Sequence, residues 1–286
     1  MGTPTIMSTT IGFARLGDGI YTARTSPLDV NTSLIVGDDA ALVIDTLSTP
    51  AQARRLLDAV RALTDRPVWV LNTHAHFDHC FGNAVLAPDG PIWAHEAAAA
   101  DLREHGPARQ REAVAEAGDA GLAADFAAGI AEATIKIPDH VVRAPQVLDL
   151  GGRTVTIEHF GRGHTDGDVV AFADGVVFTG DLAESGAPPS FGPDSYPLLW
   201  PETLAAMLHA AKTTAGAVFV PGHGAVMSSD EVAAQHADLA RFAWLIREAH
   251  GDGATVEATA GAAPWPAEAA RSGVKRGFAA LDDPLD

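Results

Sequence analysis

The chain has 286 residues, of which 47 % are hydrophobic and 20 % are charged, a composition typical of a folded protein with a sizeable core. Its 37 acidic and 19 basic residues give a net charge of −18, which disfavours nucleic acids and anionic membrane surfaces as partners. The length predicts one large domain rather than several small ones.

The chain has one cysteine, Cys80, which excludes an internal disulfide and therefore any need for an oxidising compartment during folding. Residues 1–19 contain neither a basic stretch followed by an apolar one nor the run of about 18 apolar residues that a membrane span needs. We therefore expect a cytoplasmic protein with no membrane segment.

Strand patterns alternate with a helix in the first part of the chain. Short β-type runs occupy residues 20–23, 33–36, 41–45 and 68–71, and the last two are almost continuously apolar, as buried strands are. Between them, Thr49 and Pro50 have the character of a helix cap followed by proline at the first helical position. The apolar spacing that follows predicts a helix over residues 50–63.

The middle of the chain, residues 97–133, is rich in Ala, Glu and Arg and is predicted to be helical. Gly106 with Pro107, and Gly118 further on, predict breaks that divide it into two or three helices. Strand patterns return at residues 154–160, 169–172, 176–179 and 217–221, with a helix over 202–214. Two more helices are expected over 231–250 and 267–281, and loops over 184–199 and 251–266.

The strongest chemical signal follows the apolar strand at residues 68–71. Three histidines and an aspartate fall within six residues, namely His74, His76, Asp78 and His79. Imidazole and carboxylate suit a borderline divalent cation, and at this spacing the four side chains can divide between two neighbouring ions. Solvated loop histidines would be the structural alternative, but such a dense cluster beside a strand end favours a metal site.

Three further strand ends deliver candidate ligands. His164 lies in a glycine-rich turn after the strand at 154–160, Asp181 follows the strand at 176–179, and His223 follows the strand at 217–221. The sequence around them reads G-H-T, T-G-D and P-G-H-G.

In this order, with H-x-H-x-D-H first, the motifs resemble those of the dinuclear branch of the metallo-β-lactamase superfamily, over about residues 17–227. The resemblance implies that one metal ion is bound by His74, His76 and His164. It implies that a second is bound by Asp78, His79 and His223, and that Asp181 bridges the two. The expected cofactor is two Zn²⁺ per chain, with iron or manganese as other metals that such ligands accept.

The resemblance also implies the fold, an α/β (α+β) αββα sandwich of two mixed β-sheets flanked by helices. On this reading residues 1–286 form a single domain, with a helical insertion at about 97–137 and C-terminal helices at about 229–286. Asp45, at the end of the strand at 41–45, matches a strand-end aspartate that orients metal ligands. A helix cap is the alternative for Asp45.

Several polar residues near the motifs are left outside the ligand set. Cys80 is expected to be a small buried hydrophobe, and His95 a polar strand-end residue. Hydrogen-bonding roles are expected for three others, His159, Asp166 and Asp168. Phe191 and Tyr196, with Trp200, are candidates for an apolar wall against the substrate, and ordinary loop packing is the alternative.

The resemblance, together with these patterns, implies a zinc-dependent hydrolase that uses a metal-bridging hydroxide, with Asp78 as a catalytic residue, to cleave a small ester, thioester or lactone. β-Lactam cleavage is a conceivable side activity. One alternative is an iron oxidoreductase like the persulfide dioxygenases, with a single iron on His74, His164 and Asp181. Another is a metal- or ligand-binding module without catalysis. The partner is expected to be a small molecule, and the sequence leaves the oligomeric state open.

Overall fold

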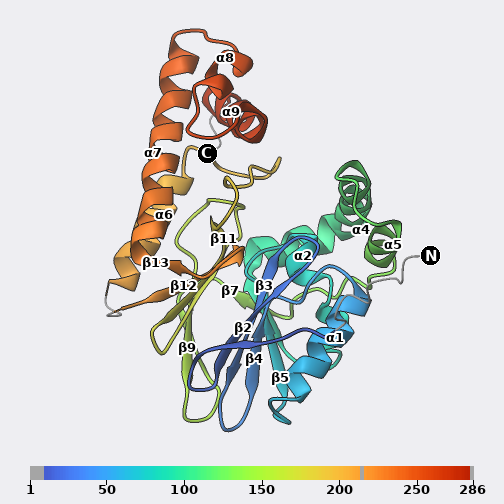
Figure 1. The fold of residues 1–286 in the computed structure, drawn as a ribbon. Helices are drawn as coiled ribbons and strands as arrows, with labels where there is room; N and C mark the ends of the chain where they lie inside the picture. Colours follow the sequence, from blue (N-terminus) through green and yellow to red (C-terminus); the bar gives the residue numbers. More distant parts are fainter. Residues whose placement is uncertain (1–9, 213–215, 284–286) are drawn as a thin grey trace, which may run out of the picture. The chain divides into compact units, whose positions relative to one another are not determined.

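The computed structural model describes residues 10–212 and 216–283, which divide into two compact units (Figure 1). Unit 1 comprises Met1–Trp93, Asp101–His140 and Asp149–Arg153, and unit 2 comprises Ala94–Ala100, Val141–Leu148 and Thr154–Asp286. The single domain expected from the length stays a prediction.

Unit 1 is built on a mixed sheet with the strand order β1-β2-β3-β4-β5-β6. Its strands are β1 (Ala14–Gly17), β2 (Ile20–Thr25), β3 (Val30–Val36), β4 (Ala41–Ile44), β5 (Val68–Leu71) and β6 (Ile92–His95). The first four pair antiparallel, whereas β4, β5 and β6 run parallel. Parallel neighbours end at the same edge of a sheet, so the segments that follow β4 and β5 start side by side.

Helix α1 (Pro50–Arg61) covers one face of this sheet (Figure 1). It begins as predicted, because the Thr49 side chain accepts a hydrogen bond from the backbone N–H of Gln52 and Pro50 occupies the first turn. Its buried face, which includes Leu56 and Val60, packs into a core cluster with residues of β3, β4 and β5. Each such buried aliphatic side chain contributes about 1.5–3 kcal/mol through the hydrophobic effect.

The strands of unit 2 pair in the order β9-β10-β11-β12-β13. Its strands are β9 (Thr154–Glu158), β10 (Val170–Ala173), β11 (Val176–Glu184), β12 (Val218–His223) and β13 (Met227–Ser228). The β10–β11 hairpin turns on Asp174 and Gly175, both with positive φ, as a two-residue hairpin loop requires. Among these pairs of described strands, β11 and β12 run parallel and the others run antiparallel.

Four helices complete unit 2, namely α6 (Trp200–Ala211), α7 (Ser229–Gly251), α8 (Val256–Gly261) and α9 (Ala267–Asp282). Helix α7 starts with a capping box between Ser228 and Glu231. Figure 1 shows α6 running beside α7, with α8 and α9 gathered at the far end of α7. The core that joins them to the sheet is rich in aromatic side chains, among them Trp200, Phe219 and Phe242. The end of the helix expected over 202–214 lies outside the described residues.

The remaining elements are α2 (Phe77–Cys80), α3 (Asn83–Leu86), α4 (Glu96–Asp119), α5 (Ala124–Ala131), β7 (His140–Val142) and β8 (Gln146–Asp149). The break expected at Gly106 and Pro107 is wrong, because α4 runs through both residues. An interior proline costs a helix about 3 kcal/mol. Leu102 and Ala113 are buried on either side of it and Gly106 packs against Ile135, so packing outweighs that cost. The loop expected over 251–266 is also wrong in part, since it contains α8.

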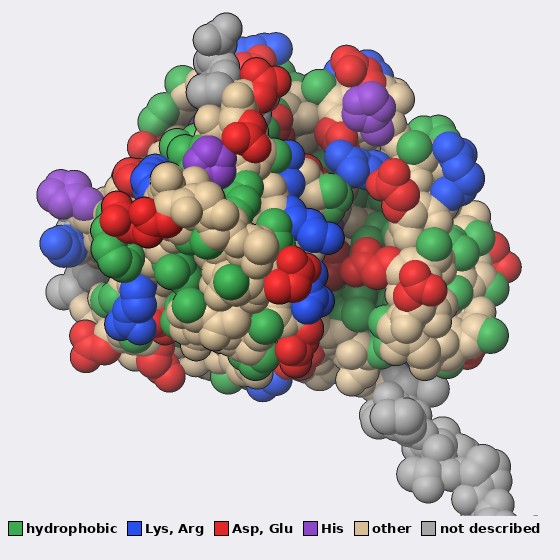
Figure 2. Space-filling view, turned by 90° about the horizontal axis from the view of Figure 1, so that it is seen from above, with side chains coloured by type: hydrophobic (Ala, Val, Ile, Leu, Met, Phe, Trp, Pro, Cys, Tyr) green, Lys and Arg blue, Asp and Glu red, His purple; other side chains and the backbone are tan. Residues whose placement is uncertain are grey.

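Acidic and basic side chains are interspersed over the face of the molecule drawn in Figure 2, so the excess of negative charge forms no single block there. Across the part of the chain that the structure describes, no helix combines the length and apolar character that a bilayer crossing needs.

Candidate metal centre

Unit 1 presents four of the predicted ligands directly after β5. His74 and His79 are almost completely buried, with 1 % and 0 % exposure, and Asp78 is 7 % exposed. The His74 ring lies 4.7 Å from the His76 ring and 4.2 Å from the His79 ring, measured between centroids. Asp78 and His79 lie in α2, a single helical turn for which the sequence analysis made no prediction.

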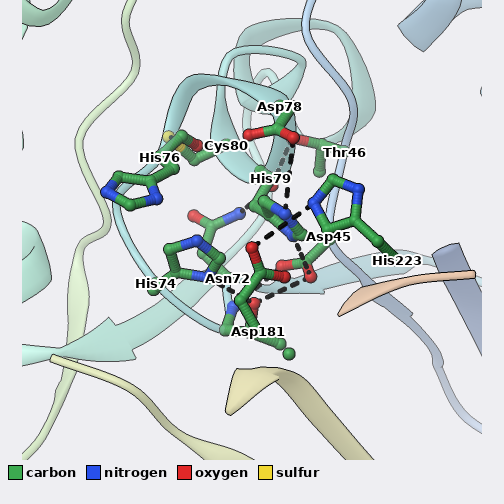
Figure 3. Close-up of polar contacts among 12 residues, drawn as sticks. Asp45, Thr46, Asn72, His74, His76, Asp78, His79, Cys80, Asp181 and His223 are labelled. Atoms are coloured by element: carbon green, nitrogen blue, oxygen red, sulfur yellow. Dashed lines mark hydrogen bonds and ion pairs between the residues drawn. The ribbon is translucent and has the colours of Figure 1, made fainter. Parts of the chain in front are cut away.

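The Asp45 carboxylate lies beside the candidate ligand His79 and contacts the segment that carries His74 (Figure 3). One carboxylate oxygen accepts a hydrogen bond from the backbone N–H of Thr73 at 2.8 Å, and the other accepts the Thr73 hydroxyl at 2.8 Å. That second oxygen also lies 2.8 Å from Nδ1 of His79, so the opposite ring nitrogen of His79 points to Asp78, 3.7 Å away. The helix-cap alternative for Asp45 is wrong, because the cap of α1 is Thr49.

Two opposed effects act on the pKa of Asp45. Burial is the larger and raises the pKa of Asp45, while the His79 ring and the two Thr73 hydrogen bonds lower it. Asp45 also adopts a positive φ of 62°, a conformation that aspartate tolerates better than most residues. The backbone bend turns the carboxylate toward the segment that carries the ligands.

A buried polar network that the sequence analysis missed fixes the other side of α2. Asn72 donates to the backbone oxygen of His79 at 3.1 Å, and the Thr46 hydroxyl donates to the same oxygen at 3.3 Å. Asn83 exchanges hydrogen bonds with Asn72 and accepts one from Thr46. Asparagine and threonine carry no metal-ligand signature, so only the three-dimensional contacts reveal this role.

Unit 2 presents His164 on the glycine-rich turn between β9 and β10. The turn is held by Asp168, whose carboxylate accepts the backbone N–H of Thr165 at 2.8 Å and the Thr165 hydroxyl at 2.7 Å. The hydrogen-bonding role expected for Asp168 is therefore confirmed. Nδ1 of His164 lies 3.1 Å from the backbone oxygen of Ser190, which leaves Nε2 on the side of Asp181.

Asp181 stands between two histidines of unit 2. Its Oδ2 lies 3.4 Å from Nε2 of His164. The same oxygen lies 3.3 Å from Nε2 of His223 (Figure 3). Asp181 is in β11 and His223 ends β12, and these strands run parallel, so their ends meet at one sheet edge. A carboxylate placed in this way can serve more than one cation.

The residues of each unit fit a divalent cation by their chemistry. All are nitrogen or carboxylate donors, and most are buried. For His79 and His164 one ring nitrogen is engaged with a protein oxygen, which orients the other as a ligand.

Gly222, the residue before His223 in β12, lies against the Asp181 side chain. A Cβ atom on residue 222 would collide with the Asp181 carboxylate. We expect Gly222→Ala to displace that carboxylate and to lower the affinity for metal ions by about 10- to 100-fold. Competition with a chelator measures this, with Gly261→Ala as the matched control, since a Cβ at Gly261 meets nothing within 4 Å. Equal affinities in the two variants would contradict the packing argument.

Of the residues left outside the ligand set, Cys80 and His95 have clear structural partners. The Cys80 thiol donates to the backbone oxygens of Ala75 and His76, and burial raises its pKa well above the usual value. His95 stacks on His159 with 4.0 Å between ring centroids, and burial lowers the pKa of His95 to about 4. Nδ1 of His159 bonds to the backbone oxygen of Asp168 at 2.7 Å, which confirms its hydrogen-bonding role.

Phe191 and Tyr196 have different surroundings. Phe191 is 7 % exposed and packs against Trp200, Phe242 and Trp265, so the loop-packing alternative describes it. Trp200 is fully buried in the same core. Tyr196 is only partly buried, and it alone of the proposed aromatic wall retains a surface for a ligand.

Comparisons with known proteins agree with the motifs. The profile described as Metallo-beta-lactamase superfamily matches residues 25–223, more than half of the 286 residues. A metallo-beta-lactamase from Pontibacter korlensis superposes with a TM-score of 0.62 at 18 % identity, over 80 % of this chain and 99 % of that one. The metallo-beta-lactamase FIM-1 from Pseudomonas aeruginosa, solved in a mono-zinc form, gives 0.61 at 19 % identity, over 81 % and 95 %. No curated protein matches at a significant level.

At these identities the structural likeness establishes the fold, and the profile match establishes the family. The predicted fold class is thereby confirmed, and the candidate metal ligands of both units lie within the matched residues 25–223. The chain belongs to the metallo-beta-lactamase superfamily, most of whose members are metal-dependent hydrolases.

Proposed function

We propose that the chain is a zinc-dependent hydrolase that cleaves a small ester, thioester or lactone. The observation that carries the proposal is that each unit presents a set of mostly buried ligands, with His79 and His164 oriented by hydrogen bonds within their own units. We propose one metal on His74, His76 and His164 and a second on Asp78, His79 and His223. Asp181, already within 3.4 Å of two histidines, is the shared ligand.

When bound, two divalent cations would lower the pKa of a bound water molecule to about 7 and polarise the carbonyl oxygen of the substrate. The side chains of the protein perform the remaining tasks. Asp45 keeps His79 in one tautomer through Nδ1. The Asp78 carboxylate accepts the proton of the attacking water and orients that water toward the substrate carbonyl. Asp168 holds the turn that presents His164.

The substrate class follows from charge as well as from the ligand set. The net charge of −18 disfavours nucleic acids, so we propose a small molecule as the partner. Similar structures are titled metallo-beta-lactamases, and β-lactam cleavage is conceivable as a side activity. The resemblance argues against β-lactam cleavage as the main activity, because β-lactamases usually lack an aspartate at the position of Asp181. We propose a cytoplasmic location, because a chain with one cysteine forms no internal disulfide and needs no oxidising compartment to fold.

The proposal predicts about two zinc ions per chain, because seven ligands exceed the four or five that one zinc accommodates. Elemental analysis of protein purified without added metal measures this. One iron and no zinc would instead favour the mononuclear iron oxidoreductase.

Asp181→Ala should weaken metal binding at both sites, and His223→Ala should weaken it mainly at one. Equal losses of both metals from the two variants would contradict the assignment.

The activity itself is tested by a panel of thioesters, lactones, simple esters, β-lactams and phosphodiesters, each measured with the zinc-loaded protein. We expect turnover of at least one acyl substrate and none of the phosphodiesters. The His74→Ala variant is the control for contaminating hydrolases. Activity that survives this substitution unchanged would show that the turnover does not come from this site.

A further inference from the structure

Two arginines flank Tyr196. The guanidinium carbon of Arg162 lies 5.2 Å from the centroid of the Tyr196 ring, and that of Arg276 lies 5.9 Å from it, both within reach of cation–π attraction. Arg162 precedes the turn of His164, and Arg276 is in α9, so the chain brings together three distant segments of unit 2. We call Arg162, Tyr196 and Arg276 the arginine–tyrosine cluster.

The cluster is attached to the turn that carries the candidate metal ligand His164. The backbone N–H of Tyr196 donates to the backbone oxygen of Gly163 at 2.9 Å. The Nε of Arg276 donates to the backbone oxygen of Ser195 at 3.2 Å. These two bonds fix the tyrosine and one arginine relative to the residue immediately before His164.

Neither arginine of the cluster forms an ion pair with a carboxylate of the described residues, although acidic residues outnumber basic ones by 37 to 19. Other arginines of the chain do pair, as Arg109 does with Asp101 and Arg143 with Glu96. In a chain so rich in acids, two neighbouring arginines without such partners leave their outer N–H groups available to an anion.

The Tyr196 hydroxyl adds a donor. It makes no hydrogen bond to any described residue. Burial, followed by the charge of Asp166, raises the pKa of Tyr196, so its hydroxyl keeps the proton at neutral pH. A protonated phenol can donate to a bound oxygen.

The electrostatic balance around the cluster limits the charge of its ligand. Asp166 and Asp194 are close enough to raise the pKa of Tyr196, against the two arginines, which lower it. Two cations partly offset by two carboxylates suit a singly charged ligand better than a doubly charged phosphate.

We propose that Arg162, Tyr196 and Arg276 bind a carboxylate group of the substrate, beside the metal ligand His164. The planar fork of arginine matches a carboxylate, and the two arginines approach from different elements. This inference rests on the proposed function, and it narrows the substrate to an ester, thioester or lactone that carries a carboxylate at a distance from the bond that is cleaved.

The test is a binding titration of the zinc-loaded full chain with benzoate, followed by NMR or calorimetry. We expect the Kd for benzoate to rise about tenfold in Arg162→Gln and in Arg276→Gln. It should fall in Asp166→Asn, which removes an opposing charge. Benzamide, the neutral isostere, should bind weakly and equally to all variants.

Arg271→Gln is the matched control, because Arg271 lies in the same helix as Arg276 but faces Glu257 at 3.8 Å. Its Kd for benzoate should equal that of the unmodified chain. Equal benzoate affinity in all arginine variants would overturn the proposal, since the ligand would then sit on zinc or elsewhere. Tighter binding of phenyl phosphate than of benzoate would overturn the choice of a carboxylate.

The measurement separates this inference from the proposed function. Arginine-dependent benzoate binding without turnover of any acyl substrate would retain the binding site and refute the hydrolase. Turnover of acyl substrates without arginine-dependent benzoate binding would retain the hydrolase and refute the carboxylate-binding site.

Discussion

Replacing Asp78 by asparagine should lower kcat by about 10² to 10⁴ while the protein keeps most of its metal. Asparagine preserves the size of the side chain and one coordinating oxygen, but it removes the negative charge and the ability to accept a proton. Asp78 is 7 % exposed and lies in the same helical turn as His79, so water cannot readily replace its carboxylate.

The measurement is kcat at saturating zinc, with metal content determined on the same sample so that a slow enzyme is distinguished from an empty one. Asp58→Asn, a change of the same kind at an exposed position of α1, is the control and should leave kcat unaltered. Near-normal kcat in fully metallated Asp78→Asn would refute the proposed role in proton transfer.

The parts of the structure that sequence predicts best are those with strong local signals. The apolar runs before His74 and Asp181 are the strands β5 and β11, and Thr49 with Pro50 starts α1 as expected. In each case a periodic pattern or a cap dictates the conformation without help from distant residues. The candidate ligands then follow from strand ends.

The errors arise where tertiary contacts override local preference. Pro107 lies within α4 although proline disfavours a helix interior, and the apolar Phe191 joins the core of unit 2 although its loop is rich in proline and glycine. β11 extends through Asp181 to Glu184, beyond the strand predicted to end at Thr179, because it gains a parallel partner in β12.

Polar side chains whose partners lie far away in sequence are the hardest to foresee. Thr46, Asn72 and Asn83 support α2 through hydrogen bonds that span up to 37 positions. Arg162 and Arg276 meet at one tyrosine although 114 positions separate them in the numbering. Neither group has a local motif, whereas the histidines of the metal centre are dense enough to be recognised alone.

The second large effect is expected from Asp45→Asn, which should lower metal affinity by changing the tautomer of His79. In the native chain Nδ1 of His79 lies 2.8 Å from Oδ2 of Asp45. Because a carboxylate only accepts hydrogen bonds, we expect Nδ1 to donate, which leaves the lone pair on Nε2 to bind metal. The other carboxylate oxygen already accepts the backbone N–H of Thr73. An asparagine that keeps this second bond must present its amide N–H₂ to His79.

Nδ1 of His79 then has to accept a hydrogen bond, so the proton moves to Nε2 and blocks the lone pair that a metal needs. We expect metal affinity to fall by about 10- to 100-fold, as for other residues that orient ligands, and kcat to fall with it. Because asparagine is almost isosteric with aspartate, the fold should persist, and circular dichroism checks this.

¹⁵N NMR of the histidine rings in the metal-free variant measures the tautomer directly, and chelator competition measures the affinity. Thr73→Val provides the comparison, since it removes one hydrogen bond to Asp45 but leaves the carboxylate facing His79. A His79 ring that stays protonated on Nδ1 in Asp45→Asn, with metal affinity unchanged, would show that Asp45 does not set the tautomer. Loss of affinity with an unchanged tautomer would instead assign the effect to the lost negative charge.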